Sequence, residues 1–342
     1  MYFRQDGDVD HTNTLDRPGW LSNVQSELRA MEETVGLVDM SIETKIEITC
    51  TQSETLTQLL DECCLYKGFG VVMKPGDIVE TVVVDEAKQT LVACVDVLKL
   101  DQHRFMFLAD AEQHVYLSSY LNEKISDNKF DIAVRDVTGE FALFGMVGPE
   151  SENILRSLLS PPFTLDNMRY GEGGCVDIGY SSNVMLCRHF IKLQHGWQML
   201  VPANQSHSLY TMLNKMGQNH GLKTIGSLAL SSLRVRHMIP TFGSEIGAHT
   251  TVESFYEGAT SSAMSLVQIE IQLPSEQNWP WGGEPVLLAG EIVTNLSSVG
   301  YCGESDKVLG LAVVRNGDLV VGDAVDIKVG SDSYRGRVTI IC

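Results

Sequence analysis

The sequence predicts an α+β fold with two antiparallel α+β units, followed by a small barrel-like β unit. Three observations predict it. Short alternating strands are separated by charged or glycine-bearing turns, the strand–helix–strand pattern occurs twice at similar length, and helical periodicity stops near residue 266. We therefore expect a loose arm over 1–17, an α+β body over 18–260 and a C-terminal β-barrel unit over 266–342.

The first unit is predicted to begin with an amphipathic helix over 20–35. Its apolar positions follow a spacing of three to four residues, namely Trp20, Val24, Leu28, Met31 and Val35. A strand over 44–49 alternates cleanly between apolar and polar residues, and 55–65 is typical of a helix. Alternating segments at 78–84, 90–95 and 104–109 then predict an antiparallel meander.

The second unit repeats this order. Strands are predicted at 132–137 and 141–147, and Pro149 with acidic residues behind it opens a helix that ends at Leu159. Further strands at 176–180, 183–188 and 198–201 precede a helix over 206–220. The similar lengths of the two series indicate a duplicated α+β arrangement.

Composition limits the functional classes. The 342 residues are 44% hydrophobic and carry a net charge of -19, which repels nucleic acid and anionic membranes. The eight cysteines form no C-x-x-C pair and mostly lie in apolar runs, so we expect free thiols in a reducing compartment, with a metal or disulfide framework as the alternative. The nine histidines show no metal-ligand spacing, and no metal cofactor is expected.

The ends and apolar runs suggest where the chain resides. The N-terminus is too acidic for a mitochondrial presequence and lacks the apolar core of a signal peptide. No run of 18 apolar residues predicts a membrane span. These features predict a cytosolic protein if the chain is complete, or a chain from which a targeting segment or a preceding domain is absent; secretion is not expected.

Several motifs occur in the order of one known family. They are Arg17-Pro18-Gly19-Trp20, Val35-Gly36-Leu37-Val38-Asp39, Asp136-Val137-Thr138, Val147-Gly148-Pro149-Glu150-Ser151, Ser232-Leu233-Arg234, His249-Thr250-Thr251-Val252-Glu253, Trp279-Pro280-Trp281-Gly282-Gly283-Glu284-Pro285 and Leu309-Gly310-Leu311-Ala312. The chain therefore resembles the folate-binding T-protein module of glycine-cleavage aminomethyltransferases and of the C-terminal halves of dimethylglycine and sarcosine dehydrogenases. The tryptophan-rich motif is similar to that of the regulatory subunit of pyruvate dehydrogenase phosphatase.

The resemblance implies a cloverleaf of three subdomains around a central hole. In that family an acidic residue holds the pterin of tetrahydrofolate while a one-carbon group is transferred, because a carboxylate can accept two adjacent N–H bonds. The resemblance also implies mitochondrial residence and a protein partner or a larger assembly. No G-x-G-x-x-G segment follows a strand, so FAD is not expected to bind to this chain.

The first acid of the family lies in a strand that reads G-G-x-x-D-D. The matching segment here is Gly76-Asp77-Ile78-Val79-Glu80-Thr81, which puts Thr81 at the critical position with Glu80 just before it. Neighbouring strand residues point to opposite faces, so we expect Glu80 to face away from the site unless the register slips by one. The strand end that reads N-A-G in the family is Ala109-Asp110-Ala111.

The second acid belongs to a turn that reads G-Y-T-G-E-D-G-F-E in the family. Here the segment runs from Phe190 to Gln198, and Gln194 is assigned to the acid's place. A glutamine keeps one acceptor but loses the charge-assisted pair, a loss of about 1–3 kcal/mol. Trp197 adjoins this loop, and His195 is interpreted as a turn residue at the surface.

The remaining residues that the resemblance implicates in cofactor binding are Arg234 and Glu253, which are retained and are also compatible with a structural role. Loss of both acids favours a non-catalytic module that binds tetrahydrofolate weakly, or binds a protein partner. The alternatives are an active tetrahydrofolate-dependent aminomethyl- or methyltransferase and the detached C-terminal part of a flavin dehydrogenase.

Overall fold

The computed structural model describes residues 19–85, 87–128, 131–192, 194–247, 250–251, 264–273, 278–302 and 307–342. The chain divides into two compact units, one made of 30–224 and the other of 1–29 with 225–342. Helix α1 (Leu21–Glu33) begins the described structure. In the described part of the chain, no helix is both long and apolar enough to cross a membrane.

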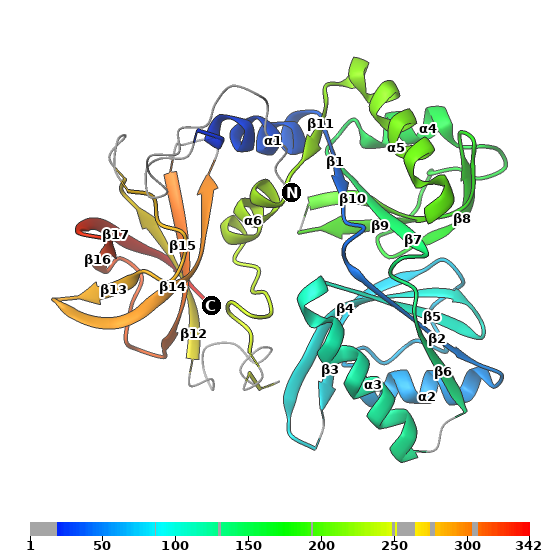
Figure 1. Ribbon diagram of the computed structural model, residues 1–342, viewed down its shortest axis with the longest axis horizontal. Coiled ribbons are helices and arrows are strands. Elements are labelled where there is room, and N and C mark those ends of the chain that lie inside the picture. Colours follow the sequence, from blue (N-terminus) through cyan, green and yellow to red (C-terminus); the bar gives the residue numbers. More distant parts are fainter. Residues whose placement is uncertain are drawn as a thin grey trace. The chain divides into compact units, whose positions relative to one another are not determined.

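The unit of 30–224 contains a five-stranded sheet in the order β3-β4-β5-β2-β6. Its strands are β2 (Thr44–Cys50), β3 (Ile78–Asp85), β4 (Thr90–Asp101), β5 (Arg104–Ala109) and β6 (Ile132–Asp136). Helices α2 (Ser53–Cys63) and α3 (His114–Asn128), drawn beside this sheet in Figure 1, pack on one face of it. Leu56 and Leu121 of these helices share a core with Phe105 and Phe107 of β5.

A six-stranded sheet in the order β11-β1-β7-β10-β9-β8 follows the same plan. Its strands are β1 (Val35–Asp39), β7 (Phe141–Val147), β8 (Gly173–Ile178), β9 (Ser181–Ile191), β10 (Gln194–Pro202) and β11 (Leu222–Ile225). Helices α4 (Ser151–Leu158) and α5 (Ala203–Gly217) cover one face, where Leu155 and Leu209 share a core with Trp197 and Met199. Two short 3-10 turns, η1 (Ala111–Gln113) and η2 (Gln218–His220), complete the unit.

The other unit contains a closed barrel in the order β12-β15-β14-β13-β16-β17. The strands are β12 (Met264–Ile271), β13 (Pro285–Leu288), β14 (Glu291–Cys302), β15 (Lys307–Arg315), β16 (Ala324–Val329) and β17 (Asp332–Ile341). Helix α6 (Ser227–Arg236) packs against β14 and β15 of the barrel. A Cβ at Gly300 of β14 would lie 2.9 Å from the Cα of Ser232, so glycine there permits the close approach of the helix.

The predicted α+β class with a C-terminal barrel is confirmed. Two helices were missing from the prediction. In α3 only Leu117, Tyr120 and Leu121 of the described side chains are buried, so its apolar stripe is short and interrupted by serines and asparagine. Helix α6 buries residues on most of its circumference and therefore lacks a clear periodic stripe.

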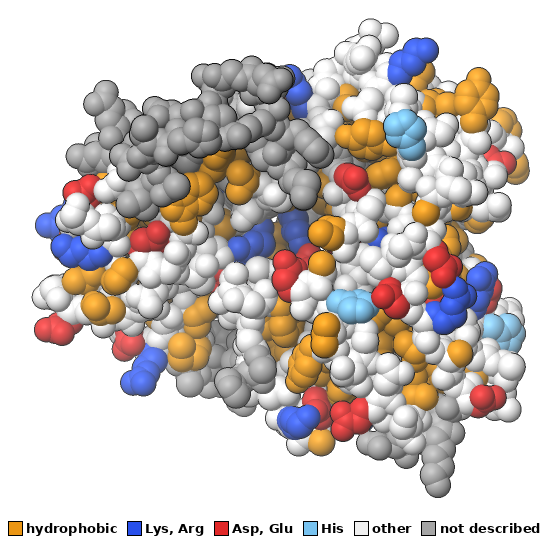
Figure 2. All heavy atoms as spheres, in the orientation of Figure 1, with side chains coloured by type: hydrophobic (Ala, Val, Ile, Leu, Met, Phe, Trp, Pro, Cys, Tyr) orange, Lys and Arg blue, Asp and Glu red, His pale blue; other side chains and the backbone are white. Residues whose placement is uncertain are grey.

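Acidic and basic side chains are interspersed on the visible face of the described residues, without a continuous basic stripe (Figure 2).

Candidate functional site

The candidate site lies where the helix-free faces of the two sheets in 30–224 meet. Asp96 of β4 belongs to the five-stranded sheet, whereas His189 of β9 and Gln198 of β10 belong to the six-stranded sheet. The His189 Nε2 atom lies 3.0 Å from Asp96 Oδ1, and the Gln198 amide Nε2 donates to Asp96 Oδ2 at 3.3 Å. A single carboxylate thus contacts two residues that each lie about a hundred positions from it in the sequence.

The register of β3 decides which of the two predicted residues faces this site. Glu80 pairs with Asp96 across the ladder, whereas Thr81 pairs with Val95. Val95 belongs to the core under α2 and α3, and the Thr81 hydroxyl accepts a hydrogen bond from the Tyr66 backbone N–H at 3.0 Å. The expectation that Glu80 points away from the site is therefore not met: Glu80 shares the face of Asp96, and Thr81 is 5% exposed in the helix-covered face.

Burial and neighbouring acids perturb the carboxyl groups of this face. The partly exposed Glu80 carboxyl is desolvated by the surrounding protein, and together with the charge of Asp96 this raises its pKa. Burial, followed by the charge of Asp110, raises the pKa of Glu43 to about 8, so this group holds a proton at neutral pH. Lys192 lies 3.5 Å from Asp110 and partly offsets the negative charge. We call this set of side chains the acidic cluster: Glu43, Glu80, Asp96, Asp110, His189, Lys192 and Gln198.

His189 is the titratable partner of Asp96 inside the acidic cluster. Burial alone would lower its pKa, but the charge of Asp96 and the hydrogen bond to it, followed by the charges of Glu80 and Glu43, outweigh burial and raise the pKa. The imidazole is 5% exposed, so its protonated form depends on Asp96 rather than on water. Contact with Asp96 therefore favours the protonated form of His189, which in that form would offset the charge of this carboxylate.

Gln198 is the residue that the sequence interpretation missed. Its side chain is 6% exposed, and its Oε1 atom has no hydrogen-bond partner among the described residues. A buried amide oxygen without a donor costs free energy, so it is an acceptor site for a ligand N–H or O–H. The signal was present, because Gln198 aligns with the last acid of the family's turn motif, four residues beyond Gln194.

Two acceptors of the cluster are the best placed for a ligand. Asp96 is engaged by His189, Glu43 holds a proton, and Asp110 lies beside Lys192. Gln198 Oε1 accepts no hydrogen bond from a described residue, and the Glu80 carboxyl lies on the same face as Asp96. Together they suit a ligand with neighbouring N–H donors or an ammonium group, and they disfavour a carboxylate.

The other predicted residues of the turn lie elsewhere. Gln194 begins β10 beside the hairpin, paired with Ile191, and is half-buried. Trp197 is 3% exposed and packs in the core under α4 and α5, on the face opposite Gln198. His195 is exposed, but it is the second residue of β10, paired with Phe190, and not a turn residue as expected; its Nδ1 hydrogen-bonds with the Tyr170 hydroxyl.

Arg234 belongs to the other unit and holds α6 to the barrel. Its Nη1 donates to the Ile239 carbonyl and to Glu245 Oε2, both at 2.8 Å, and its Nη2 donates to the Ser298 hydroxyl at 2.6 Å. The Glu245 side chain is 1% exposed, so this is a buried ion pair. Glu253 lies outside the described residues. No group of three or more side chains in the described ranges is arranged to hold a metal ion.

Family models match nearly the whole chain. Residues 1–256 match the GCVT N-terminal domain, and residues 265–340 match the glycine cleavage T-protein C-terminal barrel domain. The chain thus belongs to the glycine cleavage T-protein family, whose members bind tetrahydrofolate in one-carbon metabolism. A solved relative, the glycine cleavage system aminomethyltransferase T from Bartonella henselae, shares the fold with a TM-score of 0.75 at 16% identity, over 93% of this chain and 88% of that chain.

Curated relatives divide into transferases and longer proteins. An aminomethyltransferase of Symbiobacterium thermophilum is 23% identical over 94% of this chain and 89% of its own length. The mitochondrial pyruvate dehydrogenase phosphatase regulatory subunit of Mus musculus is 23% identical over 90% of this chain, and the mitochondrial dimethylglycine dehydrogenase of Rattus norvegicus is 22% identical over 98%. The chain spans only 37% and 40% of the lengths of these two relatives.

Proposed function

We propose that this chain is a non-catalytic T-protein-family module that binds tetrahydrofolate or a related N–H-rich ring through the acidic cluster, and serves as a regulatory or structural subunit. The observation that carries the binding is the buried Oε1 of Gln198, which lacks a donor among the described residues. A ligand that donates a hydrogen bond there removes an unsatisfied buried acceptor.

The side chains of the cluster fit the pterin part of tetrahydrofolate. That ring presents adjacent N–H donors, which the Glu80 carboxyl and Gln198 Oε1 are suited to accept. His189 and Asp96 hold the Gln198 amide in place, since Gln198 donates to the same carboxylate that pairs with His189. Binding is expected to be weak, because the neutral amide stands where the family motif ends in an acid.

Loss of transfer is supported by the charge state of the cluster. Asp96 is paired, Glu43 is protonated near neutral pH, and the pKa of Glu80 is raised. Transfer needs a preorganised ionised group near the reacting nitrogens, and removal of one such partner costs about 10²–10³-fold in rate. The cluster retains acceptors for binding but no unpaired carboxylate with an ordinary pKa for chemistry.

Calorimetric titration with tetrahydrofolate tests the binding. Gln198→Leu removes the acceptor at similar volume and is expected to weaken binding about tenfold. Gln58→Leu, the same change at an exposed site on α2, is the matched control and leaves affinity unchanged. Gln194→Glu tests the assignment of Gln194 to the acid's place in the turn motif. If this variant binds tetrahydrofolate more tightly while Gln198→Leu has no effect, Gln194 rather than Gln198 contacts the ligand and the proposal fails.

A second candidate function is an active tetrahydrofolate-dependent aminomethyl- or methyltransferase. The placement of Glu80 beside Asp96 favours it, since this face retains an acid that the sequence interpretation assigned to the opposite one. Turnover of dimethylglycine, sarcosine or an aminomethyl-lipoyl donor with tetrahydrofolate, abolished by Glu80→Gln, would establish this function instead. Absence of turnover under conditions where tetrahydrofolate binds supports the non-catalytic proposal.

Assembly and compartment complete the proposal. The regulatory subunit and the dehydrogenase among the relatives are named as mitochondrial, and we propose the same compartment and membership of a larger assembly for this chain. Native mass measurement of the endogenous protein tests the assembly. A species at the 37.7 kDa of the single chain would contradict it.

A further inference from the structure

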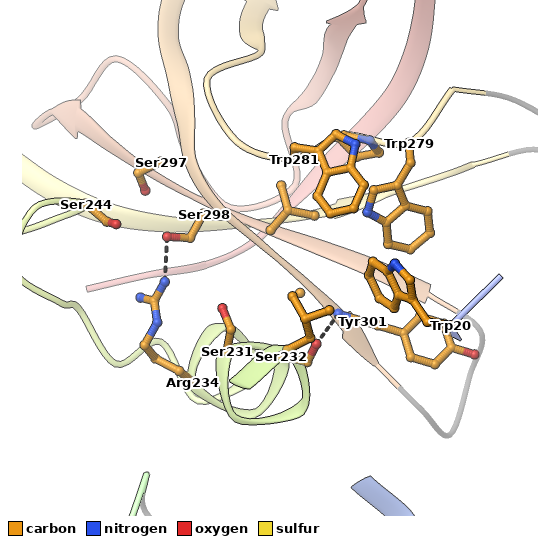
Figure 3. A pocket seen from close by; sticks show the side chains of 14 residues that line it. Trp20, Ser231, Ser232, Arg234, Ser244, Trp279, Trp281, Ser297, Ser298 and Tyr301 are labelled. Atoms are coloured by element: carbon orange, nitrogen blue, oxygen red, sulfur yellow. Dashed lines mark hydrogen bonds between the residues drawn. The ribbon is translucent and has the colours of Figure 1, made fainter. Parts of the chain in front are cut away.

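A pocket separate from the acidic cluster lies within the unit of 1–29 and 225–342, between α6, β14 and the 279–281 segment (Figure 3). Its volume is about 250 Å³, below the ~300–1,000 Å³ of sites for drug-sized ligands. It therefore suits a molecule of one or two rings. Because the acidic cluster belongs to the other unit, the two sites are testable separately.

One end of this pocket is aromatic. Figure 3 shows Trp20, Trp279 and Trp281 gathered there with Tyr301. The Trp20 and Trp281 ring centroids are 5.7 Å apart, and Trp281 remains 48% exposed. The Glu284 carboxylate fixes the segment by accepting hydrogen bonds from the backbone N–H groups of Trp281 at 2.7 Å and Gly282 at 2.8 Å. These bonds fix the backbone of Trp281, and its partly exposed indole offers a surface for a planar ring.

Arg234 lines the opposite end, and its guanidinium has N–H donors without an acceptor among the described residues. Its guanidinium has five N–H donors, and described residues accept three: two from Nη1 and one from Nη2. The Nε–H and one Nη2–H have no acceptor among the described residues. A planar guanidinium with free donors suits a carboxylate or carbonyl oxygen.

Glu245 supplies no corresponding free acceptor. Its Oε2 accepts from Arg234 and from the Thr241 N–H at 3.0 Å. Its Oε1 accepts from the hydroxyls of Ser298 at 2.6 Å and Ser297 at 2.7 Å. Both oxygens of this carboxylate are thus engaged by the protein, and the charged side chain that lines the pocket is the Arg234 guanidinium.

We propose that this pocket binds a small planar aromatic carboxylate, with its ring against Trp20 and Trp281 and its carboxylate on the spare donors of Arg234. The aromatic end alone would also suit a methylated ammonium group through cation–π attraction. The pocket disfavours a cation, because the Arg234 guanidinium lines the same small volume and the Glu245 carboxylate beside that guanidinium is already hydrogen-bonded at both oxygens. An aromatic carboxylate is stabilised at both ends of the pocket, through its ring at the tryptophans and through its charge at Arg234.

Fluorine NMR of the chain labelled with 5-fluorotryptophan tests the proposal. The chain has four tryptophans, of which Trp20, Trp279 and Trp281 line the pocket and Trp197 lies in the other unit. Benzoate is titrated against benzyl alcohol and benzyltrimethylammonium at equal ionic strength, after assignment by single Trp→Phe variants. We expect benzoate to shift the three pocket signals saturably, to leave Trp197 unchanged, and to bind more tightly than the other two probes.

Variants link the shifts to the pocket. Trp281→Leu removes an exposed ring and is expected to weaken the affinity for benzoate at least about fivefold. Tyr180→Leu, a change of a 91% exposed ring in the other unit, is the control and leaves affinity unchanged. Arg234→Gln should abolish the preference for benzoate over benzyl alcohol, with the signals of Trp20 and Trp279 in the absence of ligand reporting that this unit remains folded. Tighter binding of benzyltrimethylammonium, equal binding of benzyl alcohol, or no effect of Trp281→Leu would each overturn the proposal.

Discussion

Glu43 provides a direct test of the electrostatics of the acidic cluster. Its carboxyl has a pKa of about 8, raised first by burial and then by the charge of Asp110. The folded chain therefore keeps a proton that the unfolded chain releases between about pH 4.5 and pH 8. Because the folded state binds more protons in this window, stability falls as pH rises through it and levels off above the folded pKa.

The magnitude follows from the size of the pKa shift. The difference between 4.5 and about 8 corresponds to an upper limit of roughly 5 kcal/mol. Glu43 is half-buried and has Lys192 nearby, so we expect about 1–3 kcal/mol of this to appear. Glu43→Gln removes the ionisable group. The variant should therefore gain stability relative to the native chain between about pH 5 and about pH 9.

Urea unfolding at these two pH values measures the effect. The fluorine signal of Trp197 reports on the unit of 30–224, because its ring is 3% exposed in the core of that unit. Glu54→Gln, at an exposed position at the start of α2, is the control for loss of one surface charge. A stability difference between Glu43→Gln and the native chain that is the same at both pH values would refute the reasoning, since it would show that Glu43 ionises normally.

Two further substitutions test the packing of the two units. Glu245→Gln leaves the Arg234 guanidinium buried without a charged partner, and we expect the urea midpoint reported by the Trp279 signal to fall by the equivalent of about 3–5 kcal/mol; an unchanged midpoint would show that the pair is not structural. Gly76→Ala places a Cβ 2.5 Å from the Gly173 carbonyl at a φ of +98°, so the thermal midpoint should fall, whereas Gly139→Ala, with nothing within 4 Å, should leave it unchanged.

The strands were predictable because their two-residue period is local, but the face that each residue occupies was not. Adjacent Glu80 and Thr81 must point in opposite directions, and the sequence shows this much. Which direction meets the helices depends on α2 and α3. The following run of Val82, Val83 and Val84 gives no guide, because the sheet has helices on one face and a second sheet on the other, so apolar residues suit both.

The acidic cluster was only partly predictable for a related reason. Asp96, His189 and Gln198 come from three strands in two sheets, and Gln198 lies 102 positions from Asp96. No local pattern brings them together, whereas the motif of the turn is local and was recognised. The difference between Gln194 and Gln198 is a choice between two glutamines on the same face of β10, and the contact with Asp96 shows that Gln198 belongs to the cluster.

The two candidate functions differ in what they require of Glu80. Binding a ring with N–H donors needs only an acceptor, which the Glu80 carboxyl provides in either protonation state through its carbonyl oxygen. Transfer needs the ionised form, and the raised pKa of Glu80 means that this form is reached only at a higher pH than for an ordinary glutamate. Glu80→Gln keeps an acceptor and removes the charge. It should therefore preserve most of the affinity for tetrahydrofolate if the module only binds, and abolish turnover if the module transfers, so one variant separates the two functions.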